Sequence, residues 1–402
     1  MASIRQLGET LLSRLATGPG VYAACAALPI TFLVMAVMRL HPFLDDVSLD
    51  TTTVDDWITY KRRALSILHD GLVMPIVSGH YDLPSGFLYN YFVAGVFRLF
   101  GENSSYVYLV QAALLGLSIS AGYLAFRRYM TPGAGFAYLL TLPFFMYVDV
   151  FRHYTVTLLS ENLLLFLLPL FFFSLLRCFE RDSTLYALGA GLVLGLAFLS
   201  RPNVILVAPA TVALLFFYAK NTRRGYLRLP IAFLVAFGLS SSVLLLRNYA
   251  VTGEVSLAAV TYPGYWRTPA MALPDRAGAH SVLPTIATYG LYYGRRVLFC
   301  LGLTFLGSPE YRLRPHWLLM WAGVFLFLAS AMRGRRLEFW EAAALVFVVS
   351  YLGPTIAVAQ LANYGFRMIV PVVPAALLLS VRGGQAWHAP RLLGDTLTRT
   401  GS

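Results

Sequence analysis

Residues 21–40 have the sequence VYAACAALPITFLVMAVMRL, in which Arg39 is the only charged residue. About twenty consecutive apolar residues suffice for a helix to cross the hydrocarbon core of a bilayer. No small-residue cleavage site follows the apolar core, so we predict a retained first helix rather than a signal peptide. Further apolar runs lie near 106–126, 133–148, 157–176, 185–200, 204–219, 229–246, 317–332, 339–359 and 367–381. The chain is therefore predicted to be an all-α polytopic membrane protein with about ten transmembrane helices.

The composition of the whole chain supports the same class. Of its 402 residues 58% are hydrophobic and only 12% are charged, and the mean hydropathy is +0.66. Soluble domains contain roughly 45–50% apolar and about 25% charged residues, so a water-soluble protein and a disordered chain are both excluded. Cys25, Cys178 and Cys300 have no paired spacing, and neither a disulfide framework nor a zinc site is predicted.

The charge is strongly basic, with a net value of +12. All but two of the 31 basic residues are arginines, the exceptions being Lys61 and Lys220, and they are scattered between apolar runs. Because no contiguous basic patch exists, we expect anionic lipid head groups and lipid-linked phosphates as partners, and no nucleic acid.

The arginines also predict an orientation. With ten spans and both termini in the cytoplasm, the four short cytoplasmic loops hold eleven basic residues, whereas the short outer connections hold only Arg152, Arg201 and Arg367. Basic residues in short loops favour the cytoplasmic side. Residues 1–381 would then form one membrane domain with two long outer loops, 41–105 and 247–316, and 382–402 a cytoplasmic tail.

Two further apolar runs, 87–100 and 286–306, are ambiguous. The first contains Asn90 and Arg98, and the second has Arg295 and Arg296 at its middle. Charges at the bilayer centre are costly. We therefore predict that both runs are interfacial helices within the outer loops.

The first outer loop is acidic, and after Thr53 it is predicted to form an amphipathic helix. Trp57, Tyr60, Ala64 and Leu68 recur at helical spacing, with Lys61, Arg62 and Arg63 beside them. Such a helix is typical of one lying in the head-group plane. Asp55 and Asp56 at its start have two explanations of about equal weight, a helix cap or a chemical role.

A series of short motifs along residues 20–380 resembles the GT-C glycosyltransferases, which include protein O-mannosyltransferases and lipid A aminoarabinose transferases. In chain order the motifs are Asp55-Asp56 with Tyr60 and Ala64, Leu83-Pro84-Ser85-Gly86-Phe87-Leu88-Tyr89, Leu99-Phe100-Gly101, Leu159-Ser160-Glu161, Gly191 to Gly195-Leu196-Ala197, Leu199-Ser200-Arg201-Pro202, Leu246-Arg247-Asn248-Tyr249 with Thr252-Gly253, and Tyr364 to Arg367 with Pro371 and Pro374. No single motif is specific to this family, and the resemblance rests on the order in which the motifs follow one another.

The resemblance implies a fold and a reaction. GT-C enzymes take a sugar from a polyprenyl-phosphate carrier and attach it to an acceptor on the outer side of the membrane. An acidic residue of the first outer loop acts there as base or orients the acceptor, a role that falls on Asp55 or Asp56, with Asp55 preferred. Some relatives carry a lysine before the proline of the second motif, whereas this chain has His80-Tyr81-Asp82-Leu83-Pro84. The donor phosphate must then be bound by other residues.

The chemistry of sugar transfer requires a proton acceptor for the acceptor hydroxyl and a cation for the departing phosphate. A carboxylate can take the proton of an acceptor hydroxyl, and arginines can neutralise a phosphate leaving group by bidentate hydrogen bonds. The candidate donor ligands are Arg201, Arg247, Arg295, Arg296 and Arg367. For any one of them the commoner role is that of a snorkelling anchor at the end of a span.

The remaining candidates are polar residues near the outer side. Asp149, a reserve candidate for catalysis, lies close in sequence to Arg152 and His153, and we expect these residues to form a polar wall of the substrate site rather than a metal site. Glu161, just inside a span, is costly unless it is paired. Tyr60 and His80 complete the expected substrate-binding set.

Two other classes of protein fit the composition. A transporter would show ionisable groups at mid-membrane and two repeated halves, which this sequence lacks. A polysaccharide polymerase or ligase remains the closer alternative, although such enzymes carry their large loop late in the chain. The sequence thus predicts a glycosyltransferase of a bacterial inner (plasma) membrane, with a lipid-linked sugar donor and a glycan, lipid or protein acceptor. It specifies neither a cofactor nor a metal dependence.

Overall fold

The computed structural model describes residues 19–40, 56–71, 86–151, 160–222, 227–252, 255, 315–333, 335–357 and 370–385, and these residues form helices without a strand. The long helices are α2 (Pro19–Leu40), α5 (Ser104–Phe126), α6 (Pro132–Phe145), α8 (Ser160–Arg181), α9 (Thr184–Ser200), α10 (Val207–Asn221), α11 (Arg228–Thr252), α15 (Pro315–Met332) and α16 (Phe339–Ala357), and a last helix covers 373–385. In addition, α3 (Asp56–His69) and α4 (Phe87–Phe100) lie between α2 and α5 in the sequence. The predicted all-α class is confirmed.

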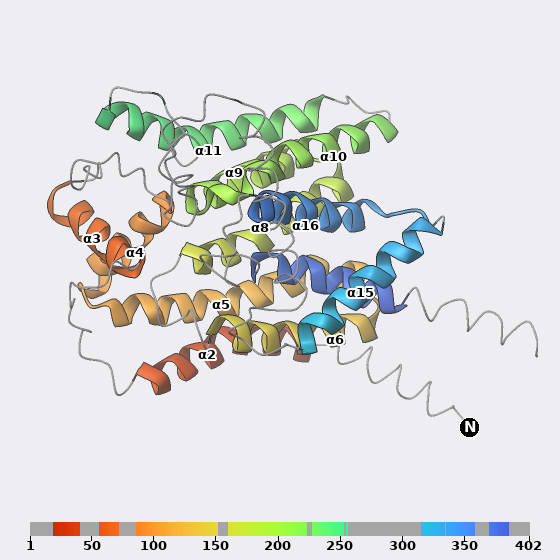
Figure 1. The fold of residues 1–402 in the computed structure, drawn as a ribbon, viewed down its shortest axis with the longest axis horizontal. Helices are drawn as coiled ribbons and strands as arrows, with labels where there is room; N and C mark the ends of the chain where they lie inside the picture. Colours follow the sequence, from red (N-terminus) through yellow and green to blue (C-terminus); the bar gives the residue numbers. More distant parts are fainter. Residues whose placement is uncertain are drawn as a thin grey trace, which may run out of the picture.

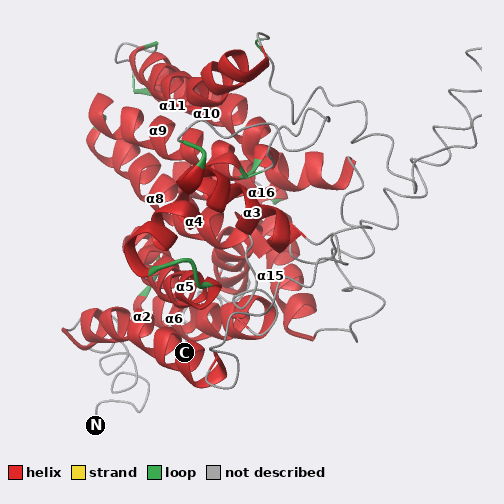
Figure 2. Ribbon diagram, turned by 90° about the vertical axis from the view of Figure 1, so that its left-hand side faces the viewer, coloured by secondary structure: helices red, strands yellow, loops and turns green. Residues whose placement is uncertain are grey.

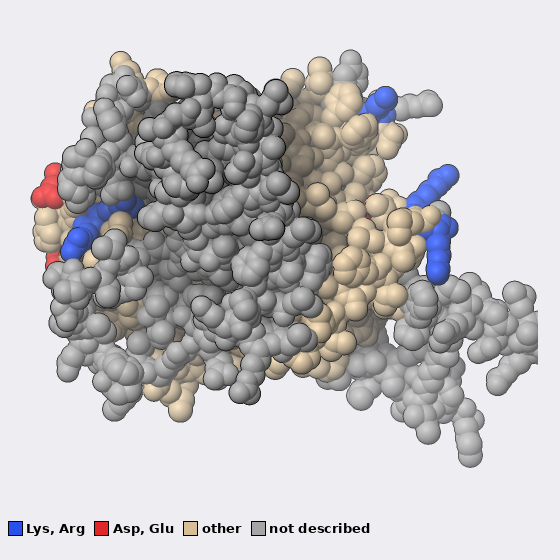
Figure 3. Space-filling model, viewed as in Figure 1, with Lys and Arg blue, Asp and Glu red and all other residues tan. Residues whose placement is uncertain are grey.

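Most of the long helices run side by side along the horizontal axis of Figure 1, from α2 at the bottom to α11 at the top. Helices α3 and α4 lie together at the left end of this bundle, the end that faces the viewer in Figure 2. Charged residues follow the same axis: on the face shown in Figure 3, the described charged side chains lie at the two ends, with uncharged residues between them. This distribution is the one expected of an integral membrane protein, because hydrocarbon excludes charge.

Every apolar run that the sequence singled out as a span contains a helix in the structure. Among the described residues, six helices are long and apolar enough to cross a membrane, and the apolar helices over 87–100, 132–148, 184–200 and 339–352 are shorter. The count of ten spans therefore stays a prediction. Residues 87–100 do form a helix, α4, whereas 286–306 lie outside the described residues.

The loops that the sequence predicts on the cytoplasmic side lie together at one end of the bundle, which we call the arginine-rich end. It is defined by Arg127, Arg128, Arg177, Arg228, Arg335 and Arg382. Arg127, Arg128, Arg228 and Arg382 each contact a residue from another loop or helix end of this group, whereas Arg177 and Arg335 contact glutamates close to them in the sequence. Arg127 Nη2, for example, donates to the Tyr22 hydroxyl oxygen at 2.6 Å, joining the end of α5 to the start of α2. Neighbouring helices thus alternate in direction as the arginine count predicts.

Glycines allow a close approach of two helices, α9 and α11. A Cβ atom on Gly191 would overlap the backbone carbonyl oxygen of Phe233, and one on Gly195 would overlap the side chain of Ser240. In lipid, helices gain no hydrophobic free energy from each other, so close packing of small residues holds them together. Gly191 and Gly195 are four residues apart, so both lie on the face of α9 that packs against α11. This packing explains the spacing of the two glycines in the family-like motif.

We expect Gly191→Ala to destabilise the protein by about 1–3 kcal/mol, the usual cost of overpacking, because the Phe233 carbonyl cannot move without shifting α11. The matched control is Gly238→Ala on α11, where an added Cβ meets no atom within 4 Å. Thermal unfolding of the detergent-purified protein should show a lowered midpoint for the first variant and an unchanged one for the second. Equal midpoints would contradict the close α9–α11 contact.

Candidate functional site

Helix α3 is docked against the end of the bundle opposite to the arginine-rich end. The side chain of Tyr60 is only 3% exposed, its hydroxyl lies 3.2 Å from Ser160 Oγ, and its ring packs edge-on against that of Tyr89 at 4.9 Å. Ala64, one turn later, is fully buried. The predicted apolar face of this helix therefore faces the protein interior. We call this end of the bundle the α3 end.

The basic side of α3 differs from the prediction. Lys61 and Arg63 are buried, at 3% and 5% exposure, and only Arg62 of the three is exposed. A helix that lay flat in the head-group plane would present all three cations to the solvent or to lipid phosphates. The structure instead encloses two of them within the protein, so α3 is a packed element of the α3 end rather than a purely interfacial helix.

Gly86 joins α3, α4 and α8. Its φ angle of +77° is one that other residues rarely adopt, and it directly precedes α4. A Cβ atom at this position would lie 3.0 Å from Tyr60 Cε1 and 3.3 Å from Ser160 Cβ. The glycine of the Leu83-Pro84-Ser85-Gly86 motif thus permits both the turn into α4 and the contact between Tyr60 and Ser160.

Two sequence motifs that lie forty residues apart meet at the α3 end. Arg201 Nη2 donates to Glu161 Oε1 in a buried ion pair, with side-chain exposures of 9% and 5%. The Ser200 hydroxyl donates to the backbone carbonyl of Ser160 at 3.2 Å, and Ser160 Oγ lies 3.4 Å from Glu161 Oε2. The Ser160-Glu161 and Ser200-Arg201 pairs therefore form one polar cluster, which Tyr60 extends to α3.

The ion pair compensates both of its charges. A buried charge that loses its partner costs several kcal/mol, whereas a bonded pair is tolerated. On α16, the buried Tyr351 lies within electrostatic range of both groups. Because the positive charge of Arg201 is matched by Glu161, this geometry favours a positioning role for the pair over direct binding of a phosphate by Arg201.

Arg247, near the end of α11 that lies opposite to Arg228, is 7% exposed, and its Nη1 donates to Oδ1 of Asn248 at 3.0 Å. Asn248 is fully buried, whereas Leu246 and Tyr249 on either side are exposed. The Leu246-Arg247-Asn248-Tyr249 motif therefore turns its two polar side chains toward the protein.

The other predicted site residues are described only in part or not at all. Asp56 is the first residue of α3, and Asp149 lies in the π-helix η3 (Met146–Phe151), a type of helix that recurs at functional sites, but their side chains lie outside the described residues. Asp56 precedes Tyr60 by four residues, so the two positions share one face of α3. The predicted residues that lie wholly outside the described part of the chain are Asp55, His80, His153, Arg295, Arg296 and Arg367.

Several residues at this end had no predicted role. Ser160, Ser200 and Gly86 belong to the quoted motifs, but their contacts are long-range, and no local signal reveals them. Tyr89 donates a short hydrogen bond to Gln111, and Asn90 is fully buried with no hydrogen-bond partner for its amide in the described part of the chain. Within the same part, no three His, Cys, Asp or Glu side chains lie together as metal ligands.

Residues 84–245 match the family model described as dolichyl-phosphate-mannose-protein mannosyltransferase. The predicted resemblance to GT-C glycosyltransferases is confirmed. The matched segment contains Gly86, the Ser160-Glu161 pair, the Gly191 to Gly195 motif and the Ser200-Arg201 pair, but not Asp55 or Asp56.

Solved structures similar to this chain include the archaeal oligosaccharyltransferase AglB from Archaeoglobus fulgidus in complex with an inhibitory peptide and a dolichol-phosphate, with 17% identity, coverage of 92% of this chain and 52% of that chain, and a TM-score of 0.45. The apo form of the Archaeoglobus fulgidus oligosaccharyltransferase is 16% identical, with coverage of 93% and 52% and a TM-score of 0.47. The chain thus spans about half the length of these structures. No curated protein sequence matches it.

We expect that replacing either partner of the ion pair alone, as Arg201→Gln or Glu161→Gln, lowers stability markedly, by about 3–5 kcal/mol, because the remaining group stays buried without its partner. The double variant should be more stable than the sum of the two losses predicts, since neither residue then carries a charge. Thermal unfolding midpoints in detergent measure the cycle, with Arg62→Gln on the exposed side of α3 as the control. Additive losses would contradict a direct pair.

Proposed function

We propose that this protein is a membrane glycosyltransferase that transfers a sugar from a polyprenyl-phosphate-linked donor to an acceptor hydroxyl on the extracytoplasmic side of a bacterial inner (plasma) membrane. The observation that carries the proposal is the contact between Tyr60 and Ser160. It holds the helix that begins at Asp56 against the part of the chain that matches the mannosyltransferase family. This contact supports our assignment of the acidic start of α3 and the family-like motifs to one site.

The reaction needs a proton acceptor. The acceptor oxygen forms a bond to the anomeric carbon, the bond between that carbon and the phosphate oxygen breaks, and the hydroxyl proton passes to a carboxylate. Asp55 or Asp56 would take this proton. Their position at the start of α3 suits the task, because the positive end of a helix keeps a carboxylate ionised at neutral pH.

The reaction also needs a cation for the departing phosphate. Glu161 already compensates the charge of Arg201, so we assign this task to one or more of Arg247, Arg295, Arg296 and Arg367. A guanidinium can donate two parallel hydrogen bonds to phosphate oxygens. The pair of Glu161 and Arg201 would then hold α8 and α9 in the geometry that α3 requires.

The sharpest test is Asp55→Asn, which keeps the shape of the side chain but removes its ability to accept a proton. We expect a loss of 10²–10⁴-fold in transfer, the usual contribution of a positioned base, with near-normal thermal stability. Mass spectrometry of envelope glycans and lipids from a deletion strain complemented with each variant measures the transfer. Asp70→Asn is the matched control, because Asp70 lies at the other end of α3 and accepts a hydrogen bond from Ser66 at 2.7 Å.

The companion variant Asp56→Asn locates the base. An active Asp55→Asn with an inactive Asp56→Asn would move the role by one residue. Activity in both would remove the pair from the mechanism and leave Asp149 as the next candidate. A deletion strain with unchanged glycans and lipids would contradict the proposed function itself.

Single replacements of Arg247, Arg295, Arg296 and Arg367 by lysine should identify the phosphate ligand. Lysine keeps the charge but loses the planar fork, so at least one variant should show a weaker apparent affinity for the lipid-linked donor. Membranes that contain each variant at equal amounts, titrated with donor, provide the measurement. Wild-type donor affinity in all four would contradict the assignment.

A further inference from the structure

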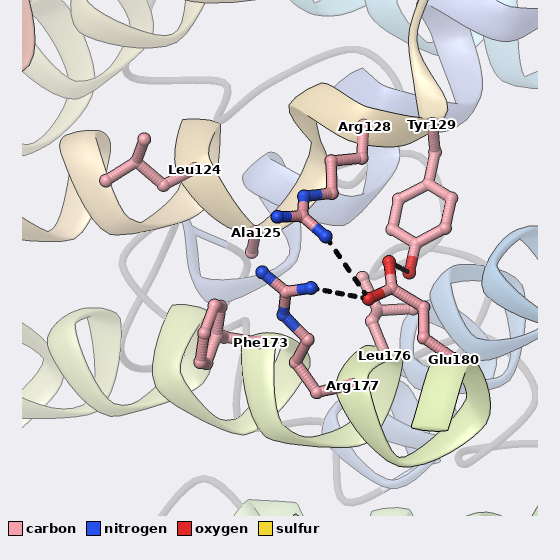
Figure 4. Close-up of a pocket in the computed structure, with 8 residues that line it drawn as sticks. All are labelled: Leu124, Ala125, Arg128, Tyr129, Phe173, Leu176, Arg177 and Glu180. Carbon is pink, nitrogen blue, oxygen red and sulfur yellow. Dashed lines mark hydrogen bonds and ion pairs between the residues drawn. The ribbon is translucent and has the colours of Figure 1, made fainter. Parts of the chain in front are cut away.

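A shallow depression, too narrow to enclose a water molecule, lies at the arginine-rich end between α8 and the end of α5 with the 3₁₀ turn η2 (Arg127–Tyr129) that follows it. We call this depression the pocket, and it is far along the bundle from the proposed catalytic site. Arg128, Tyr129, Arg177 and Glu180 form its polar wall. Its apolar wall consists of Leu124, Ala125, Phe173 and Leu176. Figure 4 shows how these side chains converge from the two helices.

The polar wall holds two cations and one anion. Arg177 Nη1 lies 2.6 Å and Arg128 Nη1 3.6 Å from Glu180 Oε2, and the Tyr129 hydroxyl donates to Glu180 Oε1 at 2.7 Å. The guanidinium groups of Arg128 and Arg177 face each other, and Glu180 lies to one side of both (Figure 4). One carboxylate compensates one of the two charges, so the pocket keeps a net positive charge, and Arg128, whose side chain is 52% exposed, can be reached from outside the protein.

Two apolar side chains lie next to the arginines. Leu124 on α5 precedes Arg128 in η2, and Phe173 precedes Arg177 on α8, each by four residues, so both lie farther from the arginine-rich end than the arginines do. In Figure 4 both side chains lie on the side of the arginines away from Glu180. Phe173 is 37% exposed, and the guanidinium carbon of Arg177 lies 5.2 Å from the centroid of its ring.

Aromatic rings mark the depth of the pocket in the membrane. Tyr129 stacks on Trp340 at a ring separation of 5.5 Å, and Arg127 lies over the ring of Tyr22 at 4.7 Å. Tyrosine and tryptophan are enriched where the hydrocarbon meets the head groups. The two arginines therefore lie at the level of lipid phosphates, and Leu124 and Phe173 lie at the level where acyl chains begin.

We propose that this pocket binds the phosphate of an anionic phospholipid from the leaflet that meets the arginine-rich end. Arg128 and Arg177 would donate to the phosphate oxygens, and the acyl chains would follow Leu124 and Phe173. Basic pockets between transmembrane helices are suited to such head groups. A free phosphate ion would make no contact with the apolar side chains, whereas a phospholipid would, so we assign the site to a lipid.

Glu180 gives the proposal a distinctive consequence. Its carboxylate competes with the lipid phosphate for the same two guanidinium groups, although it holds them in place. Removal of this negative charge in Glu180→Gln should therefore strengthen binding of an anionic lipid. A purely structural ion pair predicts the opposite, because loss of Glu180 would leave the arginines without a partner and the pocket less ordered.

The test is native mass spectrometry of the full-length protein in detergent, titrated with phosphatidylglycerol and, separately, with zwitterionic phosphatidylcholine. We expect phosphatidylglycerol to bind wild type more tightly than phosphatidylcholine. Arg128→Gln should weaken phosphatidylglycerol binding about fivefold, the contribution of one basic residue near an anionic membrane surface. Arg128 is 52% exposed, so this variant should fold. The matched control is Arg336→Gln, an exposed arginine in the linker between α15 and α16 at the same end.

The outcomes are distinct. Weaker binding in Arg128→Gln, unchanged binding in Arg336→Gln and tighter binding in Glu180→Gln together support the site. Equal losses in both arginine variants would show only a general attraction to the basic end and would overturn the proposal. Wild-type binding in Arg128→Gln, or weaker binding in Glu180→Gln, would overturn it as well. Displacement of the lipid by millimolar inorganic phosphate would assign the pocket to a free anion instead.

Discussion

Hydrocarbon offers no hydrogen-bond partner to a peptide group, and this constraint determines the form of the protein. A backbone in lipid must satisfy its own donors and acceptors, so each apolar run becomes a helix. The same medium removes the hydrophobic attraction between helices. Contact between them then depends on shape, which explains why Gly191 and Gly195 bring α9 against the backbone of α11. Charges are left at the two ends of the bundle.

The consequences of this constraint are local, and the sequence predicts them well. Apolar run lengths locate the helices within a few residues, and the arginine count predicts which loops meet at one end, as the contact of Arg127 with Tyr22 confirms. The order of the motifs predicts the resemblance to glycosyltransferases that the match of residues 84–245 confirms. Each of these inferences needs only the neighbours of a residue along the chain.

The pairing of side chains across the bundle could not be predicted in this way. Nothing in the sequence near Glu161 indicates that Arg201, forty residues later, neutralises it, and both were candidates for substrate contact. The burial of Lys61 and Arg63 has the same origin: helical spacing places them beside an apolar face, but only the fold decides what covers them. Long-range contacts depend on how the helices pack, and periodicity carries no information about that.

At both ends of the bundle, buried or half-buried acids are paired with arginines. At the arginine-rich end, the fully buried Glu341 accepts from both Arg335 and Arg382, and Glu180 is shared in the same way by Arg128 and Arg177. At the α3 end, Arg201 donates to Glu161. Sharing one carboxylate between two cations is easier for arginine than for lysine, since the guanidinium spreads its charge over several donors in a plane. The excess of arginine over lysine thus lets the protein bury its acids and still keep one end positive. In a protein inserted so that its basic loops stay in the cytoplasm, the α3 end lies on the outer side. In the proposed reaction, the donor phosphate would bind there to an arginine other than Arg201.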